Sequence, residues 1–518
     1  MKTFLMHRDH NFDLQQKPPP NELTLIQDLE LEVLLDAMAN GDKFIREVAR
    51  RAVLCGSTDA DTIRYRQDVL KDCLKNPQAV RSIYKNAVES LESDGRIWSW
   101  VNIGSPNVIL NRSVEVLYLL MNKLNELRSI IEGQGGGFES EGFRSFFAVL
   151  REELPFEYLL TIQDHLRELR LDAGVLIGAE LGQGNKGANY SLRKQKQEKK
   201  QGWASRVLPK YPPPERTLTL ESHDELGEKM LSELRERGLN SVANALAQSA
   251  DHVLAFFGAL RTELAFYLGC MSVHEKLAQM GEPTCFPSPT GLGSRALSST
   301  GLYDPCLALK SRQKVVSNDI SAENADLLVV TGANRGGKST FLRSLGLAQL
   351  MMQCGAFVTA ESFSSDMCRR VFTHFKRQED PTMKKGKLDE ELGRMSDIVD
   401  NLSQNCMVLL NESFAATNQR EGSEIASQIV NALLERRVKV LFVTHQYEFA
   451  RNFYEKKMAN ALFLRAERKT GGERTFKIVE GEPLETSYGE DLYDRIFSGA
   501  ARKEETGKIE AGAAQKMA

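Results

Sequence analysis

The sequence predicts a chain of mixed fold, in which a helical part with a small β-rich insertion precedes an α/β domain. Three observations support this prediction. Apolar residues recur every three or four positions in long stretches before Met271, a spacing typical of packed helices. Glycine-punctuated short strands interrupt that pattern between about residues 133 and 220. From Asp326 onward, short apolar runs alternate with helical stretches, as expected for parallel strands that are buried on both faces.

The composition is that of an ordinary folded protein and gives little indication of its partners. The 518 residues are 42% hydrophobic and 26% charged, which excludes a largely disordered or fibrous chain. A net charge of −3 shows no basic bias, so any anionic partner must be held by local patches. The eight cysteines lack the spacing of metal ligands, which predicts reduced thiols and no zinc site. Since no signal peptide or membrane span is apparent, we expect a cytoplasmic protein without a membrane partner.

The first part of the chain is expected to be an extended lead-in followed by long helices. Residues 1–22 are polar and end in three prolines, which favours an extended segment. A helical domain is predicted over residues 23–300. One predicted helix face carries its apolar residues at steps of three and four: Leu117, Leu120, Leu124, Leu127 and Ile131. A longer series from Leu246 to Met271 predicts a long helix whose apolar stripe packs against other helices.

A small β-rich insertion is predicted between these helices, at about residues 133–220. The glycines of Gly133–Gly137 break the preceding helix. Short strands are predicted at Val175–Leu181, Asn189–Arg193 and Thr217–Leu220, with glycines at the turns between them.

The end of this insertion is strongly basic. Residues 193–210 hold seven basic side chains and one acid, a local charge of +6 in a chain of net charge −3. Clustered lysine and arginine bind a phosphate backbone by releasing its counterions. The candidate DNA contacts are Arg193, Lys194, Lys196, Lys199 and Lys200. The alternative is a solvated loop that leads into a proline linker at Pro212–Pro214.

The last third of the chain is predicted to be an α/β domain over residues 301–498. Leu327–Val330, Cys406–Leu410 and Val438–Val443 are short apolar runs of the kind that form buried parallel strands. Leu462–Ala466 and Thr475–Val479 flank two glycines and are expected to form a β-hairpin. Residues 499–518 are small and polar, so we expect a disordered tail.

A phosphate-binding loop lies at the start of this domain. The predicted nucleotide-binding residues are Gly332, Ala333, Asn334, Arg335, Gly336, Gly337, Lys338, Ser339 and Thr340, and the first eight fit the pattern G-x-x-x-x-G-K-[ST] completely. An apolar run precedes the loop and a helical stretch, Thr340–Met352, follows it, as the motif requires. We expect backbone amides to surround the phosphates of ATP. Lys338 is expected to bridge the β- and γ-phosphates, and the Ser339 hydroxyl to ligate Mg²⁺.

Two later strands are each predicted to deliver a polar side chain to the same site. The apolar run Met407–Leu410 ends in Asn411 and Glu412, and Glu412 is predicted to act as general base on the attacking water. The next strand ends in Thr444 and His445. We expect His445 to contact the γ-phosphate, although a histidine at a strand end is more often only structural.

These segments together resemble the ATPase domain of MutS-type proteins. The resemblance rests on TGANRGGKST at Thr331–Thr340, NES at Asn411–Ser413, Thr444-His445 and SYG at Ser487–Gly489, in that order. The lead-in Val316–Ile320 is similar to the segment that the family places before its loop, and Ile63–Leu70 is similar to the family's helical core. The resemblance covers roughly Leu23 to Phe497 and is strong only over the ATPase domain.

The resemblance implies a dimeric ABC-class ATPase that surrounds DNA with helical levers and a small β-clamp. The helical domain then corresponds to core and levers, and the insertion at about 133–220 to the clamp. The segment after Gly386 is similar in position to the signature loop, which completes the ATP site of the partner subunit. Its candidate residues are Gly386, Lys387 and Glu391.

Three departures from the family pattern are expected to matter. Because the sequence begins at the helical core, the family's N-terminal mismatch-reading and connector domains are not expected, which places mismatch reading in doubt. Asn411 stands where the family has aspartate, so the metal site, predicted to consist of Ser339 and Asn411, lacks one negative charge. Slow hydrolysis or weak metal affinity is expected from this change. Gly386 replaces the signature serine and removes a hydroxyl from the partner's site.

The function predicted from the sequence is an ATP-hydrolysing DNA clamp of the MutS type, in repair or recombination. ATP and Mg²⁺ are the expected cofactors, and double-stranded DNA, branched or distorted, and a second copy of the chain are the expected partners. The alternative is an ATP-gated scaffold that binds a protein and does not contact DNA. A transporter subunit and a long coiled-coil ATPase both fit poorly, because the chain lacks an LSGGQ-type sequence and a long heptad run.

Overall fold

The computed structural model describes residues 2–98, 105–171, 174–194, 224–377, 386–468 and 474–484. The chain forms two compact units, each assembled from separate stretches of sequence. The helical unit contains residues 1–4, 76–139 and 143–264, and the sheet unit contains residues 5–75, 140–142 and 265–518. Several predicted features lie outside the described residues: the strand Thr217–Leu220, the prolines 212–214, the turn glycines 471–472, the segment Ser487–Gly489 and the tail from residue 499.

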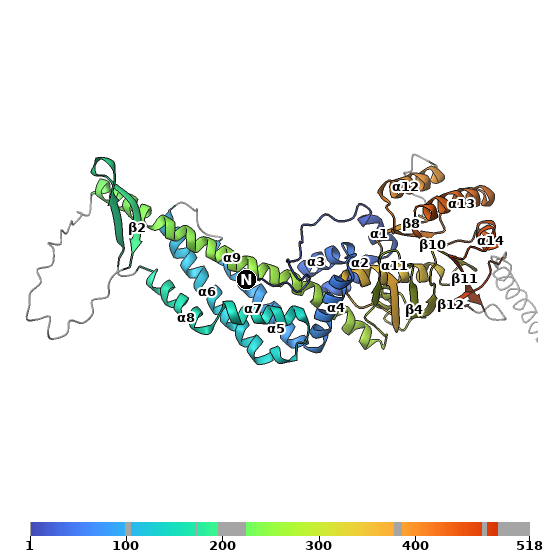
Figure 1. The fold of residues 1–518 in the computed structure, drawn as a ribbon, viewed down its shortest axis with the longest axis horizontal. Helices are drawn as coiled ribbons and strands as arrows, with labels where there is room; N and C mark the ends of the chain where they lie inside the picture. Colours follow the sequence, from blue (N-terminus) through green and yellow to red (C-terminus); the bar gives the residue numbers. More distant parts are fainter. Residues whose placement is uncertain are drawn as a thin grey trace, which may run out of the picture. The chain divides into compact units, whose positions relative to one another are not determined.

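The helical unit is built on long helices that carry one β-hairpin. Its elements are α5 (Pro77–Trp98), α6 (Pro106–Gln134), α7 (Glu141–Glu153), α8 (Phe156–Glu168), β1 (Leu176–Leu181), β2 (Gly187–Arg193) and the larger part of α9 (Glu225–Gln279), with short 3₁₀ turns at Gly135–Gly137 and Gln183–Asn185. The helices predicted from apolar spacing are present as α6 and α9. Strands β1 and β2 pair antiparallel and lie beside the first turns of α9 (Figure 1). A Cβ at Gly238 would lie only 2.7 Å from the Ile177 side chain, so this glycine allows the close approach.

Within the described residues, the β-rich part of the insertion begins later than the sequence predicted. Residues 141–168 form α7 and α8, and described strands occur only from Leu176 to Arg193. The cause is an aromatic cluster whose residues are spaced as on a helix: Phe143, Phe146 and Phe147 are buried, and Phe146 lies 6.3 Å from Phe256 of α9 between ring centroids. Burial of large aromatic rings stabilises α7 against α9.

Helix α9 is long and apolar enough to cross a membrane by length and composition alone. Most of its apolar segment is nevertheless buried inside the protein. Phe256, Phe257, Leu260 and Leu264 are almost completely inaccessible to solvent. This burial is the property of a helix that forms part of a protein core.

The sheet unit contains two β-sheets with helices around them. Its helices are α1 (Glu22–Asp28), α2 (Leu31–Ala39), α3 (Lys43–Leu54), α4 (Ala60–Lys75), α10 (Pro305–Ser311), α11 (Lys338–Cys354), α12 (Lys387–Asn401), α13 (Gln419–Glu435) and α14 (Tyr447–Glu455). Its strands are β3 (Ser288–Thr290), β4 (Leu297–Leu302), β5 (Asn318–Ser321), β6 (Leu327–Thr331), β7 (Ser362–Asp366), β8 (Val371–Phe375), β9 (Met407–Asn411), β10 (Lys439–Val443), β11 (Ala461–Arg468) and β12 (Arg474–Glu480).

The central sheet has the order β12-β11-β6-β10-β9-β8. Strands β11, β6, β10, β9 and β8 are mutually parallel, and β12 pairs antiparallel with β11. The predicted apolar runs are therefore β6, β9 and β10, and the predicted hairpin is β11–β12. Because the strands are parallel, the residues that follow β6, β10, β9 and β8 lie at one edge of the sheet.

Helix α11 and helices α12–α14 cover opposite faces of this sheet (Figure 1). Val408 and Leu410 of β9 belong to the buried cluster that includes residues of α12, α13 and α14. Leu409 points to the other face, where a Cβ at Gly346 of α11 would lie 2.6 Å from its Cδ1. The absence of a side chain at Gly346 thus brings α11 directly onto the sheet.

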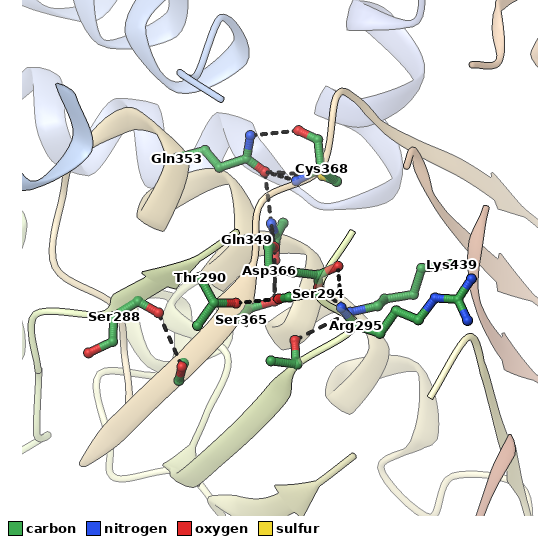
Figure 2. A network of polar contacts seen from close by, with 12 residues as sticks. Ser288, Thr290, Ser294, Arg295, Gln349, Gln353, Ser365, Asp366, Cys368 and Lys439 are labelled. Carbon is green, nitrogen blue, oxygen red and sulfur yellow. Dashed lines mark hydrogen bonds and ion pairs between the residues drawn. The ribbon is translucent and has the colours of Figure 1, made fainter. Parts of the chain in front are cut away.

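A buried polar network joins α11 to the second sheet, which has the order β3-β7-β4-β5 (Figure 2). The Gln349 amide donates to the backbone oxygen of Asp366 (2.9 Å), and its oxygen accepts from the Ser365 hydroxyl (2.9 Å). Gln353 donates to the Cys368 carbonyl oxygen (2.8 Å), and Lys439 of β10 forms an ion pair with Asp366. Because buried polar groups are costly without partners, this network fixes the position of α11.

The boundary between units differs from the linear division expected from the sequence. Helices α1–α4 belong to the sheet unit together with the phosphate loop, although they lie in the predicted helical domain. The lead-in contains bends and turns without a helix or strand between residue 2 and Glu22, and it is packed against the unit, because Leu5 and Met6 are completely buried. Arg66 of α4 is also buried, and it donates to the carbonyl oxygens of Met6 (2.9 Å) and Cys354 (3.3 Å). These contacts attach α4 and the lead-in to the end of α11.

Candidate functional site

The phosphate loop connects the end of β6 to the first turn of α11. Gly332 and Gly337 have positive φ angles of 114° and 90°, which disfavour any residue with a side chain. A Cβ at Gly332 would also lie 3.0 Å from the backbone nitrogen of Ala466. The loop is closed by a hydrogen bond from the Gly336 amide to the Ala333 carbonyl oxygen (3.2 Å). The strand–loop–helix arrangement predicted from the motif is therefore present.

The Lys338 side chain is folded over this loop. Its Nζ donates to the carbonyl oxygens of Gly332 (2.9 Å) and Ala333 (3.0 Å), and only 4% of the residue is exposed. Burial lowers the pKa of Lys338 below its ordinary value, whereas the nearby Glu412 carboxylate acts in the opposite sense. A buried ammonium group at the mouth of such a loop is well placed to bind a phosphate anion.

Ser339 and Asn411 lie side by side where α11 approaches the end of β9. The Ser339 hydroxyl donates to the Asn411 side-chain oxygen (2.9 Å). Both groups offer the neutral oxygen ligands that Mg²⁺ accepts alongside water and phosphate oxygens. The pair therefore fits a magnesium ion that is shared with bound phosphates, but it supplies no negative charge of its own.

Glu412 and His445 form a second pair at the same edge of the sheet. His445 Nδ1 lies 3.4 Å from Glu412 Oε2, and Glu412 adopts a left-handed backbone conformation with φ of 52°. The Glu412 amide donates to the Val443 carbonyl oxygen (2.8 Å), which holds the two strand ends together. The hydrogen bond with His445 lowers the pKa of Glu412 although burial opposes this shift. The carboxylate is thus ionised at neutral pH, as a general base requires.

Two cavities open on either side of the start of α11. One has a volume of about 260 Å³ and a largely apolar lining that includes Leu302, Val316, Phe341 and Phe476, with Gly337 of the loop. The other has a volume of about 730 Å³ and is lined by charged side chains together with Ser339 and Asn411. The first cavity suits a flat aromatic base. The second is lined by three cations and three acids and lies next to Ser339, directly after the phosphate loop.

A buried histidine beside this site was not identified from the sequence. His374 of β8 contacts the Ser413 hydroxyl through Nδ1 (2.8 Å) and the Glu391 carbonyl oxygen through Nε2 (3.0 Å), and its ring stacks on Phe414. It therefore holds the segment after Glu412 against helix α12. The only available signal was its position at the end of an apolar run in Val371–Phe375.

His374 gives the protein a predicted loss of stability in acid. Burial lowers its pKa from 6.5 to about 4. Between these values the unfolded chain binds a proton that the folded chain does not, so the free energy of unfolding falls as the pH decreases. We expect a shallower pH slope for His374→Asn than for the unsubstituted protein between pH 6.5 and 5 in denaturant titrations. The free energy of unfolding measured above pH 7 gives the effect of lost packing alone. An unchanged pH slope in His374→Asn would contradict the lowered pKa of His374.

The candidate residues of the signature loop lie at the start of α12. Gly386 precedes its first turn, which begins at Lys387. Glu391 faces the interior of the sheet unit, with 1% of the residue exposed, and burial raises its pKa. In this arrangement Gly386 and Lys387 are nearer the surface than Glu391, and a role for these three residues in a partner's site stays a prediction.

The candidate DNA contacts are only partly within the described residues. Arg193 ends β2, and Lys194 follows it and forms an ion pair with Glu168 (2.9 Å). Lys196, Lys199 and Lys200 lie outside the described residues. Across the described part of the chain, no cluster of three or more histidine, cysteine, aspartate or glutamate side chains is arranged for a metal ion.

Comparisons with known proteins match both parts of the chain. Residues 58–280 match the MutS2 N-terminal domain, and residues 328–495 match MutS domain V. The DNA mismatch repair protein MutS of Thermus aquaticus is 30% identical over 234 residues, which is 45% of this chain and 28% of that protein. The MutS proteins of Clostridium kluyveri (31% over 172 residues, 32% of this chain) and Thermotoga sp. strain RQ2 (34% over 179 residues, 34% of this chain) are also similar.

The matched segments cover less than a third of these relatives, at 28%, 20% and 22% of their lengths. The two family matches nevertheless follow one another in the expected order and include the phosphate loop, Asn411, Glu412 and His445. The chain belongs to the MutS family of DNA-repair-related proteins.

Proposed function

We propose that the chain binds and hydrolyses ATP at the carboxyl edge of its central sheet. The observation that carries this proposal is the convergence of Lys338 over its loop and two side-chain pairs, Ser339 with Asn411 and Glu412 with His445, at one edge of the sheet. Membership of a family of ATPases adds independent support. The apolar cavity beside Gly337 would receive the base, and the loop would receive the phosphates.

Each of these side chains would have a separate role in ATP hydrolysis. Lys338 would exchange the two loop carbonyl oxygens for phosphate oxygens when ATP enters. Glu412 would accept a proton from the attacking water as the bond between the β- and γ-phosphates breaks. The hydrogen bond to His445 would keep this carboxylate ionised and oriented. His445, on the adjoining strand, would face the γ-phosphate.

Ser339 and Asn411 would hold Mg²⁺, which neutralises phosphate charge when it is bound. Because an asparagine has no formal charge, the attraction between this pair and the ion is weaker than for an aspartate at the same position. We therefore propose a weak metal site and slow hydrolysis.

We further propose that ATP joins two copies of the chain and that the helical unit closes on double-stranded DNA, branched or distorted, in repair or recombination. Family membership and the exposed start of α12, where Gly386 and Lys387 lie, support this proposal. The β1–β2 hairpin would be the clamp element. We place this activity in the cytoplasm and assign no membrane partner.

Charge reversal at Lys194, Lys196, Lys199 and Lys200 tests the clamp. We expect at least about tenfold weaker duplex binding, and a slope of log affinity against log salt that is shallower by about 0.9 per lost phosphate contact. Fluorescence anisotropy at several salt concentrations gives both values, with Lys71→Glu/Lys457→Glu, two lysines of the sheet unit, as control. Unchanged DNA affinity would show that this stretch is a linker, and no binding by the unsubstituted protein would favour an ATP-gated protein scaffold.

A further inference from the structure

The charged cavity beside Ser339 and Asn411 contains a lysine that the proposed mechanism does not use. This cavity of about 730 Å³ is lined by residues from α11, from the end of β8, from α1 and its link to α2, and from α12. The apolar cavity opens on Thr340, Phe341 and Ser344, which lie on a different face of α11 from Ser339 and Arg343. A nucleotide with its base in the apolar cavity would therefore direct its terminal phosphate toward the charged one.

Lys376 occupies the end of β8 within this cavity. Phe375 pairs in register with Asn411, so Lys376 lies one step further along the sheet edge, next to Glu412. Its amide donates to the Asn411 carbonyl oxygen (2.9 Å), which fixes the backbone. Its side chain is exposed, and it forms no ion pair or hydrogen bond with the residues that the structure describes. The ammonium group is therefore available to a ligand.

The other two cations of this cavity, Arg343 and Arg377, are less exposed than Lys376. Arg343 donates to the Asp304 carboxylate (2.5 Å) and also forms an ion pair with Glu30. Burial raises the pKa of the half-buried Asp28 carboxyl group, and the positive charge of Arg377 only partly opposes this shift. Lys376 is thus the exposed cation among the described residues that line the cavity, and its charge also acts on the neighbouring Glu412 carboxyl group, where it helps to lower the pKa.

The two groups of the proposed metal position carry no charge themselves, although Glu412 follows Asn411 and the acids Asp28, Glu30 and Glu390 line the same cavity. Asn411 and Ser339 contribute neutral oxygens, and the positive charge of Lys376 in the same cavity opposes the binding of a divalent cation. The same ammonium group attracts a phosphate that carries several negative charges. Both effects shift the neutralisation of phosphate charge from a metal ion to the protein.

We propose that Lys376 binds the terminal phosphate of ATP and replaces part of the charge neutralisation that Mg²⁺ provides, so that ATP binds with little dependence on Mg²⁺. This inference rests on the proposed nucleotide site. It assigns Lys376 as a binding residue that distinguishes ATP from ADP, because ADP has no phosphate that reaches the charged cavity.

Isothermal titration of the full chain with ATP and ADP, in Mg²⁺ and in EDTA, tests this role. For the unsubstituted protein, replacing Mg²⁺ by EDTA is expected to weaken ATP binding by about threefold or less. For Lys376→Gln, ATP binding in EDTA is expected to weaken by about tenfold, with little change for ADP. Lys376→Arg should retain most of the affinity for ATP. Lys457→Gln, at an exposed lysine after α14 that lines neither cavity, should behave like the unsubstituted protein.

Two results would overturn the assignment. Equal ATP affinity of Lys376→Gln and the unsubstituted protein in EDTA would show that Lys376 does not contact the nucleotide. Equal weakening of ATP and ADP would place it away from the terminal phosphate. In both cases nucleotide still binds, so the proposed site survives. Failure of the unsubstituted protein to bind either nucleotide would instead overturn the proposed function, and this inference with it.

Discussion

Replacement of Lys338 by alanine is expected to abolish ATP binding, with a loss of affinity of at least about a hundredfold. The buried ammonium group is the positive charge at the centre of the phosphate loop, 2.9 Å from the Gly332 carbonyl oxygen. Without it, the phosphates would face two carbonyl oxygens whose partial negative charge repels them. Titration with a fluorescent ATP analogue measures the loss directly.

The control for this variant must separate binding from folding. Lys338 donates two hydrogen bonds within the loop, so circular dichroism and thermal unfolding should accompany the titration. Lys457→Gln, which removes a lysine of the same unit away from both cavities, should bind ATP normally. Unchanged affinity of folded Lys338→Ala would contradict the assignment of the loop.

Glu412→Gln is expected to slow hydrolysis by about 10²–10⁴-fold while ATP binding is retained. Glutamine keeps the shape of the side chain and a polar contact with His445, but it cannot accept a proton from water. ATP should therefore be trapped, and dimers that depend on ATP should accumulate. Single-turnover hydrolysis and sedimentation velocity measure the two effects.

A matched control for Glu412→Gln is Glu424→Gln. This substitution neutralises an exposed acid on α13 that is not one of the proposed site residues. It should hydrolyse ATP at the normal rate. Normal turnover by Glu412→Gln would exclude Glu412 as the base and would assign proton transfer to another group.

The central sheet was predictable because its strands carry an unambiguous pattern. β6, β9 and β10 are continuous apolar runs, and the groups that follow them had to meet because parallel strands end at one edge. The contact between Ser339 and Asn411 follows from the same rule. The second sheet was missed because its strands lack this signal: β7 reads Ser-Phe-Ser-Ser-Asp and β3 is only Ser288–Thr290.

Other features depend on contacts between residues far apart in the sequence. Helices α1–α4 have ordinary amphipathic patterns, and nothing local indicates that Arg66 would be buried against the Cys354 carbonyl oxygen. The placement of Lys376 beside Glu412 is equally impossible to predict locally, because it depends on the pairing register of β8 with β9. Helix α7, by contrast, was detectable: Phe143, Phe146, Phe147 and Leu150 follow the spacing of a helix face.

ATP turnover at this sheet edge is expected to be coupled to DNA. The most direct measurement is the steady-state rate of ATP hydrolysis by the full chain, compared among homoduplex, mismatched, branched and single-stranded DNA. We expect slow hydrolysis that requires Lys338 and Glu412 and that changes on addition of at least one double-stranded DNA. A rate of ATP hydrolysis that none of these DNAs changes, or that is retained in Lys338→Ala, would contradict the proposed function.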